Sequence, residues 1–294
     1  MSTGTTTTSP LALRPAAEAA VFGPDRIDEL VECFRTNGFA ILRGLFSEAQ
    51  LTEIEEQCGE AQAALSRGEL DERHGTTILI DDEVAGTVEV ANYVSYVSDL
   101  SPAVRAAITH PTVLPALREI LGEDCWLMDR RQFGFVYQDA RPGRESAYTR
   151  IGWHADWQSA PHLDLWPSVA LTIHLDGTSP ANGFLRVVPG SQRWATPAPY
   201  RNVNGAEVPE GAAESAGWTD EAPPFEMPLR FEPVPGEIPV YAERGDLLLH
   251  DAYLWHAAAR GTDDTSRRRH VRGHWCTGEE LTTDDGVFVK NAAR

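Results

Sequence analysis

The stretch "PSVALTIHLDGTSPANGFLRVVPGS", residues 167–191, contains two short apolar runs separated by turn residues. Apolar runs of this length that are bounded by Gly, Pro, Asn and Asp are typical of β-strands. Asn182 and Gly183 suit a tight turn that requires positive φ. The stretch therefore predicts two strands joined by compact turns.

Further strands are expected on both sides of this stretch, at "CWLMDRRQFGFVYQ" (125–138), "GDLLLH" (245–250) and "RRHVRGHW" (268–275). The first half of the chain has helical patterns instead. One helix is expected to close near Asn37 and Gly38, and a second to begin at Ser47, with Gln50 completing a capping box. A third, in residues 101–122, is interrupted at Pro111. Helices followed by short strands predict a mainly β fold with α, in which helices buttress an antiparallel sandwich or barrel.

The chain has 294 residues, which suits a single decorated domain. We expect a disordered tail at 1–20 and one domain at 21–294, with helical support at 21–125 and the β core at 126–280. Residues 198–244 are rich in Pro, Glu and Gly and too long for a plain connection. This insertion is predicted to form a lid.

Charge and composition exclude several classes of function. The formal net charge of −19 opposes binding to nucleic acids and to anionic membranes. The single lysine, Lys290, argues against Schiff-base chemistry and phosphate-binding loops. No apolar run approaches the ~18 residues of a membrane span, and no secretory signal is evident. We therefore expect a cytoplasmic protein.

The motif "IGWHADW", residues 151–157, places a histidine and a carboxylate two positions apart. In an extended chain His154 and Asp156 project to the same side and could share one ion. A second motif, "GDLLLHDAYLWHAAARG", carries His256 about a hundred residues later, with His250 as an alternative ligand. Two histidines and one carboxylate form a face suited to iron that leaves positions open for substrate and oxygen.

A third motif, "TSRRRHVRGHW", begins a strand with three arginines. A guanidinium fork there could clamp a dicarboxylate, which lysine could not do in the same way. Alternation along the strand would place Arg268, His270, Arg272 and His274 on one face, with Arg267 and Arg269 on the other.

In these motifs the chain resembles the phytanoyl-CoA dioxygenase (PhyH) family of Fe(II)- and 2-oxoglutarate-dependent oxygenases. The matching words extend from about Phe34 to Trp275 and include "FRTNGFAILRGLFSEAQL", "WHAD", "LDGTSPANGFLRVVPGSQRW", "GDLLLHDAYLWHAA" and "SRRRHVRGHW". The resemblance implies a double-stranded β-helix, or jelly-roll, core similar to that of the cupins. It implies His154, Asp156 and His256 as metal ligands and Arg268, with Arg267 as the alternative, as the residue that binds 2-oxoglutarate.

The resemblance further implies a non-haem Fe(II)/2-oxoglutarate-dependent dioxygenase that uses O2 and releases succinate and CO2. Because Asp156 is retained, where halogenating relatives have a small residue, hydroxylation of an unactivated C–H bond of a small molecule is expected. Desaturation, epimerisation or ring closure at the same site are alternatives, as is a non-catalytic metal-binding jelly-roll protein.

The sequence says less about the substrate than about the metal ligands and the co-substrate. Trp157 and Trp166 are candidates for its pocket because large aromatic residues dominate binding sites as well as cores. A locally basic segment suggests an anionic or carrier-bound substrate; it contains Arg130, Arg131, Arg141, Arg144 and Arg150. Scarce lysine beside abundant arginine and alanine is typical of GC-rich bacterial genomes, which favours a secondary-metabolite or amino-acid-like substrate.

Overall fold

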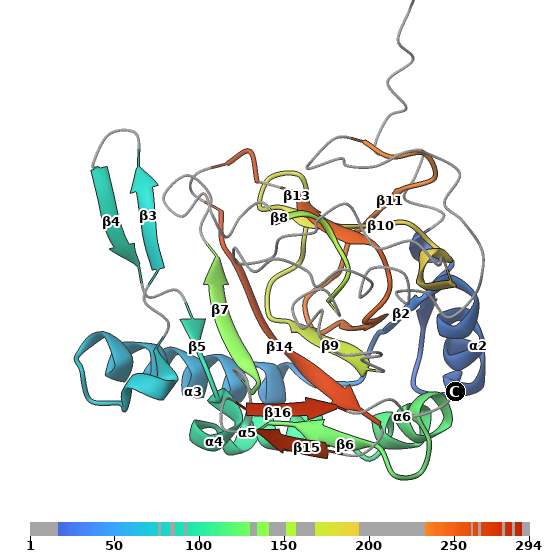
Figure 1. Ribbon diagram of the computed structural model, residues 1–294, viewed down its shortest axis with the longest axis horizontal. Coiled ribbons are helices and arrows are strands. Elements are labelled where there is room, and N and C mark those ends of the chain that lie inside the picture. Colours follow the sequence, from blue (N-terminus) through green and yellow to red (C-terminus); the bar gives the residue numbers. More distant parts are fainter. Residues whose placement is uncertain are drawn as a thin grey trace, which may run out of the picture.

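The computed structural model describes residues 17–75, 78–82, 86–90, 93–129, 134–140, 151–156, 168–193, 233–259, 261–263, 266–277, 280–283 and 286–289. Within them, two β-sheets are stacked over a group of helices (Figure 1). The helices are α2 (Ile27–Asn37), α3 (Glu48–Ser66), α4 (Val97–Leu100), α5 (Pro102–Ile108) and α6 (Val113–Leu121). No helix of the described residues is long and apolar enough to cross a membrane.

The larger sheet has the strand order β1-β2-β12-β9-β14-β7-β5, with β6 beside β14, among the described residues. Apart from the parallel β1–β2 pair, its strands are antiparallel. Its strands are β1 (Val21–Phe22), β2 (Phe39–Leu42), β5 (Tyr93–Val94), β6 (Trp126–Met128), β7 (Val136–Ala140), β9 (Ser168–His174), β12 (Leu247–Asp251) and β14 (Arg268–Cys276).

The smaller sheet has the order β11-β10-β13-β8 in the described residues. Its strands are β8 (Ile151–His154), β10 (Phe184–Val187), β11 (Ile238–Val240) and β13 (His256–Ala259). Two further hairpins are formed by β3 (Ile78–Asp82) with β4 (Gly86–Val90) and by β15 (Glu280–Thr283) with β16 (Gly286–Val289). Two facing antiparallel sheets buttressed by helices are the predicted jelly-roll architecture, which is confirmed.

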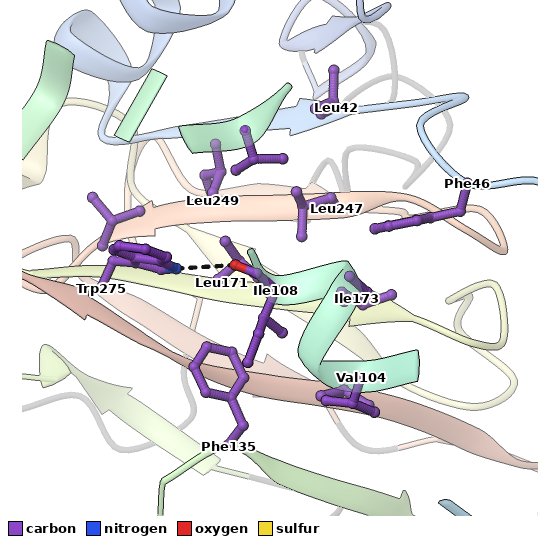
Figure 2. Packing of buried hydrophobic residues seen from close by; sticks show 14 of the residues in the cluster. Leu42, Phe46, Val104, Ile108, Phe135, Leu171, Ile173, Leu247, Leu249 and Trp275 are labelled. Carbon is purple, nitrogen blue, oxygen red and sulfur yellow. Dashed lines mark hydrogen bonds between the residues drawn. The ribbon is translucent and has the colours of Figure 1, made fainter. Parts of the chain in front are cut away.

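Strand β9 shows how the larger sheet separates its two faces. Val169, Leu171 and Ile173 are fully buried against the helices, whereas the intervening side chains of β9 face the smaller sheet. Figure 2 shows the helical side of this core, where Val104 and Ile108 of α5 pack toward Leu171 and Ile173. Each fully buried aliphatic side chain contributes about 1.5–3 kcal/mol to folding. The helical half thus holds one face of the sheet rigidly and leaves the other face for chemistry.

A buried indole joins this core to the end of a helix. Trp275 Nε1 donates a hydrogen bond of 3.2 Å to the carbonyl oxygen of Ile108, the last residue of α5 (Figure 2). Carbonyls in the last turn of a helix have no partner within the helix, so the indole satisfies one of them. This contact fixes β14, which carries Arg268 and Arg269, against the helical layer.

The predicted helix boundaries agree with the structure. Helix α2 ends at Gly38, which adopts φ of 79°, and the Ser47–Gln50 capping box begins α3. The third predicted helix is divided into α5 and α6 on either side of Pro111, because proline disfavours helical geometry in the residue before it. Gly183 has φ of 86°, as the predicted turn requires.

Two predicted boundaries need correction. Ala17 and Ala20 fall within the predicted disordered tail but are 4% and 3% exposed and pack beside Ile41 and Leu248. The predicted lid, 198–244, includes β11, which pairs with β10 as a strand of the smaller sheet. The rest of the tail and residues 198–232 lie outside the described residues.

Candidate metal centre and co-substrate pocket

A cavity lies between the two sheets. Six of the nine histidines of the chain line it, together with Arg268, Arg272 and a single carboxylate, Asp156, among the described residues. The six are His154, His174, His250, His256, His270 and His274. Imidazoles, guanidinium groups and one carboxylate in a common cavity point to metal and anion binding rather than to a hydrophobic ligand.

The predicted ligands His154, Asp156 and His256 come together in the smaller sheet. His154 ends β8, His256 begins β13, and the two residues are register partners across these strands. One ligand atom from each of the three residues lies within 4.8 Å of the others, and no other such group occurs in the part of the chain that the structure describes. The metal-binding role of this triad stays a prediction, but its geometry suits a single ion.

The hydrogen bonding of His256 leaves its other ring nitrogen suited to a metal. His256 Nδ1 lies 2.9 Å from the carbonyl oxygen of Leu254, which can only accept, so Nδ1 carries the proton. In the neutral ring Nε2 then keeps its lone pair, and this atom lies 3.5 Å from Asp156 Oδ1. The ring of His154 lies beside it, with centroids 4.2 Å apart. A metal ligand with its second nitrogen bound to a backbone carbonyl is fixed in both tautomer and orientation.

Two further histidines hold the other oxygen of Asp156. His250 Nε2 and His274 Nε2 lie 3.1 Å and 3.2 Å from Oδ2. Burial alone would raise the pKa of Asp156, but the neighbouring His256 and the hydrogen bonds from these imidazoles hold that pKa well below its usual range. Asp156 is therefore ionised, and Oδ2 is occupied while Oδ1 faces the triad.

The tautomer of His250 follows from this contact. Burial lowers the pKa of His250 to about 4, so the ring is neutral near pH 7. Because a carboxylate only accepts hydrogen bonds, the single proton is on Nε2, and Nδ1 has no partner among the described residues. His250 is thus placed as a donor to Asp156, outside the triad. Sequence reasoning missed this role, as well as that of His274, since it depends on the register that aligns both residues with Ala170.

The three adjacent arginines have different environments. Arg267 Nη2 bonds Asp139 Oδ2 at 2.7 Å, and Arg269 forms a bidentate pair with Asp176 at 2.7 and 2.8 Å. Arg268 lines the cavity with 7% of its surface exposed. Burial lowers the pKa of Arg268 to about 10, which still leaves it charged near pH 7. The predicted alternation along β14 is confirmed.

Among the described residues, Arg268 has no compensating anion. Its Nε atom is buried without a hydrogen-bond partner in the described part of the chain, and no described carboxylate pairs with the guanidinium. Both ring nitrogens of His174 and Nδ1 of His270 are likewise buried and unpartnered there. Burial and the Arg268 charge hold the pKa of His174 at about 3 and that of His270 well below its usual value. A buried cation beside neutral imidazoles is a site that an anionic ligand would complete.

The predicted substrate-pocket residues Trp157 and Trp166 lie outside the described residues, as do the arginines of the basic segment between 130 and 150. Trp153 is described and is fully buried, with the Arg186 guanidinium 5.0 Å from its ring centroid.

The sequence was compared with models of known protein families to find the family to which this cavity belongs. The profile of the phytanoyl-CoA dioxygenase (PhyH) family matches residues 34–269, which is most of the chain. The chain belongs to the phytanoyl-CoA dioxygenase family. This match confirms the predicted family and includes the triad and Arg268, while Arg272 and His274 lie beyond its end.

Curated relatives of this PhyH chain are dioxygenases. An ectoine dioxygenase of Nocardia farcinica is 28% identical over 58% of the chain and 52% of its own length. A dioxygenase of Aspergillus fumigatus, af480, is 26% identical over 79% of the chain and 62% of its own length. The chain therefore spans about half to three-fifths of the length of these relatives.

Solved structures share the fold of this PhyH chain. EctD from S. alaskensis, with 2-oxoglutarate and 5-hydroxyectoine, has a TM-score of 0.58 and 18% identity over 86% of this chain and 78% of that one. The epimerase SnoN, in complex with Fe3+, alpha ketoglutarate and nogalamycin RO, has a TM-score of 0.56 and 19% identity over 87% and 85%. At 18–19% identity these neighbours show a shared fold, whereas the family match and the dioxygenase relatives agree with the predicted cofactor set of iron, 2-oxoglutarate and O2.

Proposed function

We propose that this chain is a non-haem Fe(II)- and 2-oxoglutarate-dependent dioxygenase that hydroxylates an unactivated C–H bond of a small molecule and releases succinate and CO2. The observation that carries the proposal is the coexistence, in one cavity, of the His154–Asp156–His256 group and the buried Arg268, which no carboxylate of the described residues pairs. The first fits a metal ion, and the second fits the far carboxylate of a dicarboxylic acid.

The donor set suits iron(II). It offers two imidazole nitrogens and one carboxylate oxygen on a single face, the arrangement typical of non-haem iron oxygenases. His256 is fixed by Leu254, and Asp156 by His250 and His274, so both ligands are oriented before a metal binds. Such preorganisation supports a functional site over an incidental cluster.

Arg268 suits a carboxylate because its planar fork can donate two parallel hydrogen bonds. Gly183 leaves room for this guanidinium: a Cβ added there would lie 2.7 Å from Nη1. His174 and His270 border the same position and can donate further hydrogen bonds from their neutral rings. This environment supports Arg268, rather than Arg267, as the residue that binds 2-oxoglutarate.

When bound, iron(II) would activate O2; oxidative decarboxylation of 2-oxoglutarate would supply two electrons and take one oxygen atom into succinate, and the C–H bond would supply the other two electrons and receive the other oxygen atom. The chain itself supplies the positions of the reactants. Arg268 sets the far end of the co-substrate, and the triad sets the near end. Leu185, Leu248 and Ala258 give the cavity an apolar wall that limits water. The ionised Asp156 fills a ligand position, which favours oxidation over halide transfer.

The proposal is tested by turnover of 2-oxoglutarate. Purified protein is incubated with Fe(II), ascorbate, 2-oxoglutarate and O2, and succinate is quantified with and without candidate substrates. We expect succinate in the wild type, because these enzymes also turn over slowly without substrate, and a loss of at least tenfold in His154→Ala. A matched control is His110→Ala, since His110 lies in the turn between α5 and α6, outside the cavity lining.

Protein that is shown to bind iron but forms no succinate above the metal-free background would contradict the proposal. It would favour the non-catalytic jelly-roll protein instead.

A further inference from the structure

A second arginine, Arg272, lines the cavity beside Arg268, and the proposed function gives it no role. It faces the same side of β14 as Arg268 and is the register partner of Thr172 on β9. It lies two residues from His274, which contacts Asp156, so at ~3.3 Å per residue it is about 7 Å along the strand from that level. Arg268 lies four residues beyond Arg272, on the side away from His274, and its guanidinium extends to Gly183, just before β10 of the smaller sheet. The two arginines thus occupy different depths of the cavity, and Arg272 is on the side of the metal ligands.

The charge of Arg272 has no ionic partner in the part of the chain that the structure describes. Its Nη2 donates a hydrogen bond of 3.3 Å to the neutral hydroxyl oxygen of Tyr93, and its guanidinium lies 5.6 Å from the centroid of that ring. No carboxylate of the described residues forms an ion pair with it. Arg267 and Arg269, on either side of Arg268, differ because they are paired with Asp139 and Asp176.

Tyr93 fixes the direction of this guanidinium. Tyr93 is 6% exposed and belongs to β5, which is held to β7 by pairing with Gln138. Only Nη2 of the guanidinium donates to Tyr93, so its other N–H groups remain available for a planar acceptor. Gln138 and Gly273 also line the cavity at this end, and neither carries charge. The contact therefore braces a cation without neutralising it.

Formal charges indicate what this cation would bind. In the proposed function, a divalent metal, ionised Asp156, doubly charged 2-oxoglutarate and Arg268 cancel one another. Arg272 then remains as one uncompensated positive charge in the lining, where Asp156 is the sole described carboxylate. A substrate with one negative charge would restore neutrality, and a planar carboxylate matches the fork of arginine.

We propose that Arg272, braced by Tyr93, is the binding site for a carboxylate of the organic substrate, so that the enzyme acts on small carboxylic acids. This inference rests on the proposed function for the occupancy of Arg268. It assigns the two arginines of one strand to two different anions, with 2-oxoglutarate on Arg268 and the substrate on Arg272.

The test uses trifluoroacetate as a small carboxylate probe, followed by its fluorine NMR linewidth. The protein is loaded with Mn(II) in place of iron and with saturating 2-oxoglutarate, so that Arg268 is occupied and the metal broadens nearby signals. We expect saturable broadening in the wild type, none with neutral trifluoroethanol, and at least a tenfold weaker affinity for trifluoroacetate in Arg272→Met. Arg35→Met is the control, because Arg35 is exposed on α2 and pairs with Glu119.

Two further variants protect the test against misfolding. Arg272→Lys keeps the charge and is expected to retain part of the binding, and Tyr93→Phe, which keeps the ring but loses the hydrogen bond, is expected to weaken it about two- to fivefold. The proposal is overturned if Arg272→Met binds the probe as the wild type does, or if the wild type shows no saturable broadening.

The affinity for 2-oxoglutarate separates this inference from the proposed function. We expect Arg272→Met to change it by less than threefold. An increase in Kd as large as that in Arg268→Met would assign Arg272 to the co-substrate and overturn the inference, leaving the dioxygenase proposal intact. Failure of Mn(II) to bind, seen by water relaxation, would instead contradict the dioxygenase proposal. In that case the fluorine linewidth of trifluoroacetate is measured with metal-free protein. A comparison of the wild type with Arg272→Met then still shows whether Arg272 binds an anion.

Discussion

Replacing Arg268 by methionine should stabilise the metal-free protein while it abolishes tight binding of 2-oxoglutarate. Burial lowers the pKa of Arg268 to about 10. At ~1.4 kcal/mol for each tenfold change in proton affinity, the charged group costs about 3 kcal/mol in the absence of an anion. Methionine fills a similar volume without charge, and exchange of a buried ion for an apolar group is commonly neutral or stabilising by ~1–4 kcal/mol. We therefore expect Arg268→Met to raise the free energy of unfolding by about 1–3 kcal/mol.

The effect on binding has the opposite sign. A buried, bidentate contact between guanidinium and carboxylate contributes ~2–5 kcal/mol when one partner is truncated. At ~1.4 kcal/mol per factor of ten, a loss of about 3 kcal/mol raises the Kd for 2-oxoglutarate roughly a hundredfold. Urea unfolding in a buffer without carboxylates or phosphate measures the first effect, and anaerobic calorimetry on Fe(II)-loaded protein measures the second.

Arg267→Met is the matched control, because Arg267 precedes Arg268 but donates to Asp139, which is 2% exposed. Its loss removes a donor from a buried carboxylate, so we expect a destabilisation of about 1 kcal/mol and an unchanged affinity for 2-oxoglutarate. The reasoning is refuted if Arg268→Met destabilises the metal-free protein by more than about 1 kcal/mol, or if it binds 2-oxoglutarate as tightly as the wild type.

Three further predictions concern the surroundings of the two sites. His274→Phe should weaken Fe(II) binding by roughly 10–100-fold, because Asp156 Oδ2 loses a donor, whereas His274→Gln should retain part of it; equal metal affinities by competition with a chelator would contradict this. Gly183→Ala should weaken 2-oxoglutarate binding more than Gly236→Ala does. Both glycines have positive φ, but only a Cβ at position 183 would contact Arg268. Equal affinities of the two variants in calorimetry would contradict this prediction. The metal-free protein should lose stability below pH ~6.5, because His174 then takes up a proton in the unfolded chain but not in the folded protein, where its pKa is about 3. The contribution of His174 to the free energy of unfolding is complete above pH ~6.5. Below that pH it falls by about 1.4 kcal/mol per pH unit, down to the folded pKa. His174→Gln should show a correspondingly smaller slope in urea unfolding at pH 7, 6 and 5, and identical slopes would contradict the assignment.

Local sequence signals were sufficient to predict the elements that depend on nearby residues. The Ser47–Gln50 capping box, the Gly38 helix end and the Gly183 turn each rest on contacts within a few positions, and each is confirmed. Alternation along one strand likewise separates Arg268 from Arg267, because a strand has only two faces.

What could not be predicted depends on how distant strands align. The contacts of His250 and His274 with Asp156 require β12, β9 and β14 to pair in one particular register, which no short motif specifies. The surroundings of Arg272 are similar, because the register of the described strands decides that Tyr93, and none of their carboxylates, lies beside it. Composition suggested a lid across 198–244, but the apolar Ile238–Val240 run inside that range completes the smaller sheet.

The central claim is that the triad holds iron and Arg268 holds 2-oxoglutarate in the same cavity. The most direct measurement is anaerobic titration of the apoprotein with Fe(II) and 2-oxoglutarate, followed by the weak visible metal-to-ligand charge-transfer band, in the wild type, His256→Ala and Arg268→Met. The account predicts a band in the wild type that is absent in His256→Ala and needs about a hundredfold more 2-oxoglutarate in Arg268→Met. Iron binding without a band in the wild type, or a band unchanged in both variants, would contradict it.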